Sequence, residues 1–254
     1  MFKAYKLTGA VFLFCVFIAG ALVLRLYAVT DVNRRKVSVW WTSVMCRIGG
    51  RFLGVRVHAD EAFENDGRGR LMVCNHMSYL DILVLSSVKP SVFISSVEIE
   101  KTFLLGFLAK IGGTFFVERR NVRNIKGELD GITKIISQGF NVVLFPEGTS
   151  TDGSQILPFR SSFLAGASEA GVDVVPVCLK YSKIDGESFS PENCDFVCWY
   201  GDMSFAPHFS RFASVRRTDV DVSFMEGMSS LEHDRKYITR RAQELIEAVY
   251  FTAS

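Results

Sequence analysis

The sequence predicts an α/β fold in which helices cover a mixed sheet, with a hydrophobic helical membrane anchor at the N-terminus. Three observations predict it. Beyond residue 70, short β-branched or aromatic runs alternate with helical stretches, which is the pattern of an α/β sandwich. Residues 7–24 carry no charge and are about as long as a membrane crossing requires. Apolar residues make up 48% of the 254 positions and the mean hydropathy is +0.21, so we expect the folded chain to meet lipid.

Residues 1–50 are predicted to form two membrane-associated helices, and residues 51–254 one globular domain. The first helix covers the uncharged stretch, and the second, at 37–48, places two adjacent tryptophans beside basic residues, as interfacial helices do. Basic side chains flank both ends of the first helix, so they do not decide whether it crosses the bilayer or lies flat. A cleaved signal peptide is the other interpretation, but no small-residue cleavage site follows the apolar stretch.

Within the globular domain, local patterns predict each element. Strands are expected where β-branched and aromatic residues run between turn residues, at 71–74, 92–95, 114–117, 141–145, 174–180, 196–200 and 220–224. Helices are expected near 78–88, 99–110, 124–138, 160–170 and 231–250. The last of these shows apolar residues at helical spacing on a charged background.

The charge and the cysteines exclude several classes of protein. The net charge is +2, and the 29 Lys and Arg residues are spread along the chain, which does not indicate nucleic-acid binding. The six cysteines lack CxxC spacing and lie mostly in apolar stretches, so we expect reduced core thiols and no metal site. Reduced thiols favour an active domain on the cytoplasmic side of the membrane.

The run Asn75–Asp81 offers an imidazole and a carboxylate directly after the apolar run 71–74. A neutral imidazole can take a proton from a hydroxyl near pH 7, and a carboxylate on its other nitrogen fixes the tautomer. Positions five apart on a helix lie about 140° apart and share no face, so His76 must precede the helix that carries Asp81. We expect a strand that ends at 74, a turn, and a helix that begins at Ser78.

A purely structural interpretation of this run stays open. Ser78-x-x-Asp81 is also a capping-box pattern, in which Asp81 would only satisfy backbone donors at the helix start. That interpretation does not account for His76, which stands at a strand end, where open α/β sheets place their ligands.

Two further clusters also follow predicted strands. Arg119 and Arg120 end an apolar strand, and guanidinium groups suit phosphate because their donors are forked; a solvated strand end is the alternative. Glu147-Gly148-Thr149 ends the strand at 141–145 in a turn that can hold an anion or a polyol. An ordinary turn is the alternative there, but a glutamate between Pro and Gly at a buried strand end needs a partner.

The apolar run 174–177 is the third cluster. Its proline at position 176 indicates an edge or bulged strand, and a purely structural strand is the alternative interpretation.

In this order, the four segments His76–Asp81, Phe116–Arg119, Phe145–Thr149 and Val174–Val177 resemble the four motifs of the glycerolipid acyltransferase family. This family includes the bacterial 1-acyl-sn-glycerol-3-phosphate acyltransferases. The resemblance covers about residues 70 to 210 and implies a glycerol-3-phosphate acyltransferase-like sandwich, so that 51–254 would be the acyltransferase domain.

The resemblance also implies an activity. A fatty acyl group would pass from acyl-CoA or acyl carrier protein to the free hydroxyl of a lysolipid at the membrane, as in phospholipid biosynthesis, without a cofactor. His76 would be the general base and Asp81 would orient it. Arg119 would hold the acceptor's phosphate, with Arg120 and Arg160 as further candidates. Glu147, Gly148 and Thr149 would position its glycerol and headgroup.

Two departures from the family pattern bear on the acceptor. Many relatives carry Lys where this chain has Ser96, and Arg where it has Ser150. Both changes remove positive charge from where a phosphate would bind. The leading acceptor is 1-acyl-sn-glycerol-3-phosphate, which gives phosphatidic acid. The alternative is lyso-ornithine lipid, which lacks a phosphate. The sequences from Phe145 to Gly153 and from Trp199 to Met203 resemble a branch of the family that includes acyltransferases of this lipid. A lipid or thioester hydrolase that uses the same His–Asp pair is the alternative of another class.

Overall fold

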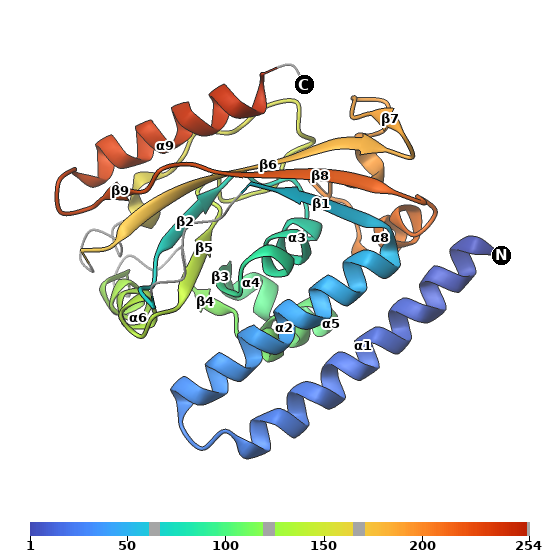
Figure 1. Cartoon of the computed structure of the whole chain (residues 1–254), viewed down its shortest axis with the longest axis horizontal. Helices are drawn as coiled ribbons and strands as arrows, with labels where there is room; N and C mark the ends of the chain where they lie inside the picture. The colour runs from blue at the N-terminus through green and yellow to red at the C-terminus, as the bar shows by residue number, and fades with distance from the viewer. Residues whose placement is uncertain (61–66, 119–124, 165–170, 253–254) are drawn as a thin grey trace.

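The computed structural model describes residues 1–60, 67–118, 125–164 and 171–252. These residues form one mixed sheet, ordered β1-β8-β6-β2-β5-β3-β4, with the short strands β7 and β9 paired to β6 (Figure 1). The strands are β1 Val55–Ala59, β2 Leu71–Cys74, β3 Ser91–Ser96, β4 Phe115–Val117, β5 Asn141–Leu144, β6 Asp173–Ile184, β7 Glu187–Ser188, β8 Thr218–Phe224 and β9 Met228–Ser229. The strands from β4 to β6 along this order run parallel, whereas β8 is antiparallel to β6.

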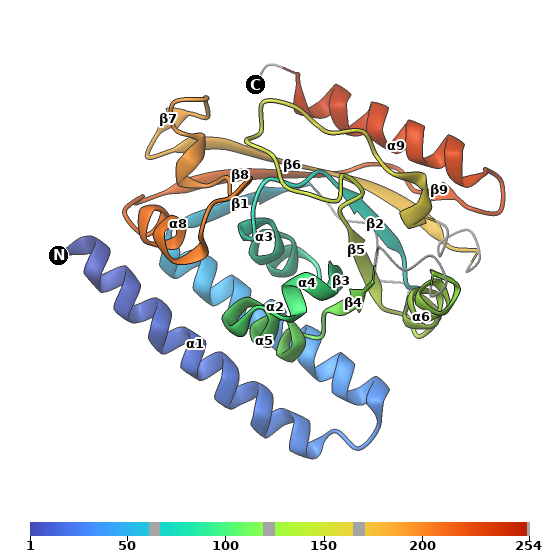
Figure 2. The same ribbon diagram turned by 180° about the vertical axis from the view of Figure 1, so that it is seen from behind.

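Helices cover both faces of the sheet, which confirms the predicted fold class. Helix α9 (Arg235–Tyr250) packs on one face, and α2 and α3 pack on the other (Figures 1 and 2). The helices are α1 Phe2–Tyr27, α2 Asp31–Leu53, α3 Leu80–Val88, α4 Val97–Glu100, α5 Phe103–Gly112, α6 Ile125–Ser137 and α8 Phe205–Phe212. Strands β2 and β5 are buried at every position, because they lie at the centre of the sheet with both faces covered.

Helix boundaries follow from local capping. The side chain of Thr30 accepts a hydrogen bond from Asn33 N at the start of α2, and Gly54, with φ of 83°, ends that helix in the left-handed conformation. The helix predicted at 99–110 is instead two helices, α4 and α5. Thr102 explains the break, because its hydroxyl accepts from Gly106 N and caps a new helix there.

The prediction of a strand at 196–200 is wrong. A 3₁₀ turn covers Cys194–Phe196, and the chain then runs on without pairing to the sheet. Val197 and Cys198 are fully buried, so their apolar character reflects packing beneath the site rather than a strand. In the helix predicted at 160–170, the described part is a 3₁₀ turn at Ser161–Leu164, and the rest lies outside the described residues. The sequence patterns also missed β1 and α8.

The proline in β6 has a different explanation from the predicted edge. Strand β6 is central, and Pro176 pairs with Val73 of β2. On its other side, β9 pairs with β6 as far as Val174, and β8 pairs with it from Val177 onward. Pro176 therefore stands where the neighbouring strand changes, so its missing N–H removes no ladder hydrogen bond on that side.

The two helices predicted at the N-terminus are present as α1 and α2, and both ends of α1 are bonded to the rest of the protein. Near its start, Lys6 Nζ donates to Leu53 O and, at 2.6 Å, to Val215 O. Near its end, Arg25 Nη2 donates at 3.0 Å to the carbonyls of Lys110 and Ile111 at the end of α5. In the described part of the chain, α1 is the one helix long and apolar enough to cross a membrane. The division of the chain at residue 50 stays a prediction.

We expect Lys6→Met to destabilise the fold by about 1–3 kcal/mol, because it leaves buried carbonyl groups without their donor. Lys3→Met is the matched control, since Lys3 is exposed on the same helix. Urea unfolding in detergent micelles measures both. Equal stability of the two variants would show that the buried ammonium group does not hold α1 in place.

Candidate active site

The turn at His76 lies at the carboxyl end of β2, between β5 and β6. Asn75 fixes where this turn leaves the sheet. Its side-chain amide donates to Leu179 O at 2.8 Å, and its side-chain oxygen accepts from Leu179 N at 2.9 Å. This pair of bonds substitutes for a strand pairing, so the turn begins in a defined place on the neighbouring strand β6.

The imidazole of His76 is held by Asp81, as the sequence predicted. His76 Nδ1 lies 2.9 Å from Asp81 Oδ2, and Asp81 is completely buried. The same oxygen accepts from the backbone N–H groups of Met77 at 2.7 Å and Ser78 at 2.9 Å. The capping interpretation and the orienting interpretation therefore both describe Asp81: one carboxylate builds the turn and positions the ring.

A fourth donor to Asp81 comes from a distant part of the sequence. The hydroxyl of Tyr181, on β6, donates to Asp81 Oδ1 at 2.7 Å. Sequence reasoning missed Tyr181, although a tyrosine beside a buried strand usually requires a partner for its hydroxyl. With four donors, the buried carboxylate is satisfied by hydrogen bonds and needs no neighbouring cation.

The other side of the imidazole is available for chemistry. The ring of His76 stacks on Phe145, with centroids 4.0 Å apart and planes 17° from parallel. Its side chain remains 20% exposed. Because Nδ1 donates to the carboxylate, Nε2 carries the lone pair, and it makes no hydrogen bond to the described residues. This is the arrangement of a general base.

Glu147 fastens the second loop to the His76 turn. Its Oε1 accepts from His76 N and its Oε2 from Leu157 N, both at 2.7 Å, and it is almost fully buried. Burial raises the pKa of Glu147 to about 7, although the two backbone donors act in the opposite direction. The partners that a glutamate in this position requires are thus the backbone N–H groups of His76 and Leu157. Its predicted contact with substrate stays a prediction.

The residues after Glu147 add further bonds between this loop and the His76 turn. Gly148 adopts φ of 78°, which a side chain would strain, and Thr149 is exposed. Ser150 Oγ donates to Trp199 O, and Thr151 N donates to His76 O at 3.0 Å. Ser150 stands where many relatives carry Arg. Its hydroxyl bonds to the segment at 196–200, which forms a loop instead of the predicted strand.

The predicted phosphate ligands are only partly placed. Arg119 and Arg120 lie outside the described residues. Arg160 is exposed, and its backbone N–H donates to Pro146 O at 3.1 Å, so it stands beside the Glu147 loop. The fourth motif, at Val174–Val177, is buried in β6 and pairs with β2, which matches its structural interpretation.

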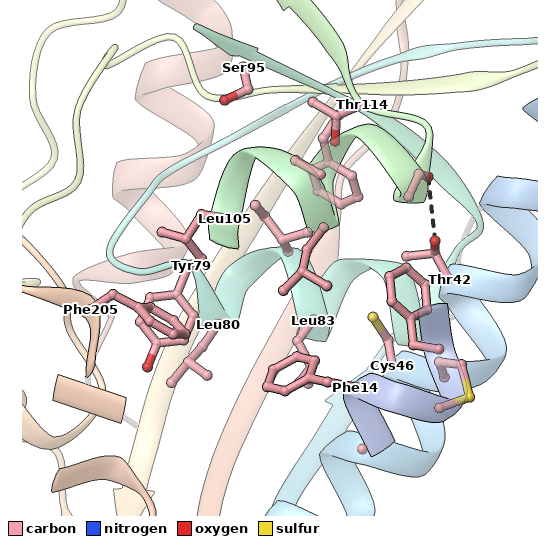
Figure 3. Close-up of a pocket in the computed structure, with 18 of the residues that line it drawn as sticks. Phe14, Thr42, Cys46, Tyr79, Leu80, Leu83, Ser95, Leu105, Thr114 and Phe205 are labelled. Carbon is pink, nitrogen blue, oxygen red and sulfur yellow. Dashed lines mark hydrogen bonds between the residues drawn. The ribbon is translucent and has the colours of Figure 1, made fainter. Parts of the chain in front are cut away.

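An apolar cavity of about 310 Å³ lies next to the His76 turn (Figure 3). Phe145, which stacks on His76, forms part of its wall. Further parts of the wall come from α1, α2, α3, α4, α5 and α8, from strand β3 and from Tyr79, Thr114 and Trp199. Tyr79 faces the cavity, and its hydroxyl lies 3.0 Å from His208 Nδ1 on α8. No sequence pattern indicated this cavity, because its wall joins segments that are far apart in the chain.

Comparison with known proteins identifies the family. The model of the family described as Acyltransferase matches residues 54–180. The chain belongs to this acyltransferase family. It is 33% identical to the lyso-ornithine lipid O-acyltransferase of Rhizobium meliloti over 82% of this chain and 72% of that protein. The corresponding protein of Rhodobacter capsulatus is 36% identical over 69% of this chain and 62% of its own length.

Further relatives carry the other predicted activity. The 1-acyl-sn-glycerol-3-phosphate acyltransferase of Neisseria gonorrhoeae is 30% identical over 71% of this chain and 69% of that protein. The crystal structure of a 1-acyl-sn-glycerophosphate acyltransferase from Thermotoga maritima has the same fold, with a TM-score of 0.66, 18% identity and full coverage of both chains. The chain is therefore an O-acyltransferase of the lysophospholipid type, as its motifs predicted.

The raised pKa of Glu147 predicts a pH dependence of stability. The unfolded chain loses this proton near 4.5 and the folded chain near 7, so between these pH values the folded state binds more protons. The contribution of Glu147 to stability then falls by about 1.4 kcal/mol per pH unit as pH rises. Relative to the non-titrating variant Glu147→Gln, wild type should lose on the order of 3 kcal/mol between pH 4.5 and 7. Urea unfolding of both proteins across this range measures it, and a pH-independent difference would contradict the raised pKa.

Proposed function

We propose that the enzyme transfers a fatty acyl group from an acyl thioester to the free hydroxyl of a lysolipid, with His76 as general base. The leading acceptor is 1-acyl-sn-glycerol-3-phosphate, which would give phosphatidic acid. The observation that carries the proposal is the His76–Asp81 pair, whose imidazole stacks on Phe145, a residue of the wall of an apolar cavity. An acyl chain requires such a cavity, and a hydroxyl requires such a base.

In the proposed reaction, His76 Nε2 takes the proton of the acceptor hydroxyl while its oxygen attacks the thioester carbonyl carbon. Asp81 holds the imidazolium that forms. When the carbon–sulfur bond breaks, the imidazolium returns the proton to the leaving thiolate. The proton balance closes without a covalent acyl-enzyme, so the reaction needs no cysteine or serine nucleophile and no cofactor. The donor would be acyl-CoA or acyl carrier protein.

The acceptor has a second candidate. Lyso-ornithine lipid is supported by the names of four relatives that are 29 to 36% identical to this chain. The site adds support, because neutral Ser150 bonds to Trp199 O where a phosphate-binding arginine stands in many relatives. These observations support the phosphate-free lipid as the alternative acceptor.

The site of action in this proposal is the membrane. Helix α1 is apolar enough to enter a bilayer, and the lysolipid acceptor resides there. The active domain would lie on the cytoplasmic face, where acyl thioesters are made and where the free thiols of the chain stay reduced.

Replacing His76 by Ala should lower the turnover number by about 10²–10⁴-fold, because the general base is lost. Asp81→Asn should cost less, since the ring remains but its tautomer is no longer fixed. The matched control is His58→Ala. His58 also bonds an aspartate, with Nε2 3.1 Å from Asp219 Oδ1, but on β1 and away from the cavity. Near-normal turnover by the His76 variant, in a chain that still folds, would sink the base assignment.

Purified enzyme in mixed micelles should transfer an acyl group from acyl-CoA to lysophosphatidic acid or to lyso-ornithine lipid, with free fatty acid measured in parallel. If the acceptor carries phosphate, Arg119→Ala should raise its KM more than it lowers the turnover number, because an interaction common to ground and transition states is lost. Transfer only to lyso-ornithine lipid, with no effect of Arg119→Ala, would establish the second acceptor. Release of fatty acid without transfer would make the protein a hydrolase and refute the proposal.

A further inference from the structure

Helix α5 is apolar on both of its sides. Its inner side, with Leu105 and Leu108, lines the apolar cavity (Figure 3). Its outer side is exposed: Phe103 is 97% exposed, Phe107 47% and Leu104 42%. Lys110 is the one charged residue of this helix. A helix that is apolar all round is usually buried in a core or in a membrane, and α5 is covered on its inner side alone by the described residues.

Helix α5 lies beside α1. Arg25, near the end of α1, donates to the carbonyls of Lys110 and Ile111 and so joins the ends of the two helices. Figures 1 and 2 show α5 on the side of the sheet where α1 and α2 lie. Around this junction, Leu22 and Leu26 of α1 are exposed as well. Exposed apolar residues of α1 and of α5 therefore lie on the same side of the sheet, in two helices joined at their ends by Arg25.

The charges around α5 suit one kind of partner. No charged residue lies between Lys101 and Lys110, both of these lysines are exposed, and Lys110 Nζ lies 3.8 Å from Glu100 Oε1. A short apolar helix with a basic residue at each end is typical of a helix at the level of lipid headgroups, where the long lysine side chains reach water.

We propose that α5 is a second membrane-binding element, whose outer side, Phe103, Leu104 and Phe107, inserts into the lipid bilayer beside α1. The occupant of this surface is lipid rather than a second copy of the chain, because α5 is joined at its end to the helix that is apolar enough to enter a bilayer. The inner side of α5 is a wall of the cavity. The thickness of this one helix would therefore separate the bilayer from the place where an acyl chain would lie. This last point rests on the proposed function.

The depth of α5 can be measured without any assay of activity. An environment-sensitive fluorophore is attached to Phe103→Cys in the full chain, with exposed Cys15 changed to Ser and the chain lacking the new cysteine as blank. Leu231→Cys is the matched control, since Leu231 is also an exposed apolar residue but lies between β9 and α9, across the sheet (Figure 1). The protein is added to phosphatidylethanolamine–phosphatidylglycerol vesicles with or without nitroxide-labelled lipid.

We expect the label at position 103 to shift its emission to the blue on vesicle binding and to be quenched by nitroxide lipid, while the label at 231 does neither. If both labels stay in water although the protein binds the vesicles, the proposal is refuted. A blue shift that grows with protein concentration and is insensitive to nitroxide lipid would show a second copy on this surface and would also refute it.

Activity then tests the role of α5 in substrate access. The double variant Phe103→Ser/Phe107→Ser should acylate a bilayer-embedded acceptor several-fold more slowly than Leu231→Ser, and a short-chain monomeric acceptor at an unchanged rate. An equal loss on both acceptors would indicate a structural defect and contradict this role. If wild type transfers no acyl group at all, the proposed function fails, while the depth measurement still decides whether α5 enters the bilayer.

Discussion

The fully buried carboxylate of Asp81 is the interaction on which the site depends. It accepts bonds from an imidazole, two backbone N–H groups and the hydroxyl of Tyr181. Removing a carboxylate from water is costly unless every oxygen is bonded, so this residue forces the turn, the start of α3 and strand β6 into one arrangement. The orientation of the His76 imidazole and the local fold of the turn are thereby two results of the same four bonds.

Glu147 is a second buried carboxylate whose oxygens accept hydrogen bonds from the backbone of the site. It joins the loop after β5 to the backbone of His76, and Thr151 and Ser150 extend the connection to the His76 carbonyl and to Trp199. Within the described residues, neither Asp81 nor Glu147 forms an ion pair with a lysine or arginine. The turn is therefore held by backbone N–H groups and the Tyr181 hydroxyl, whose fixed dipoles do not reorganise when charge develops on the imidazole.

Local spacing predicted the parts of the site that are close in sequence. The spacing of five residues between His76 and Asp81 was enough to place the imidazole before a helix. The apolar runs located the central strands. The partner Tyr181 and the cavity wall could not be predicted this way, because each depends on how distant segments meet. The segment at 196–200 shows the same limit: burial beneath the site and burial in a sheet select the same apolar residues, so composition alone does not distinguish them.

Helix α1 is bonded to the rest of the protein at both ends and also lines the cavity, so it cannot be exchanged without changing the cavity. Leu13, Phe14 and Phe17 of this helix form part of the cavity wall, and Lys6 is a buried donor to the domain. A chimera that exchanged residues 1–30 for an unrelated apolar helix would keep its attachment to lipid but would lose one wall of the chamber. In the proposed function, residues of α1 would therefore serve both attachment to lipid and selection of the acyl chain, so a substitution that changes one would also alter the other.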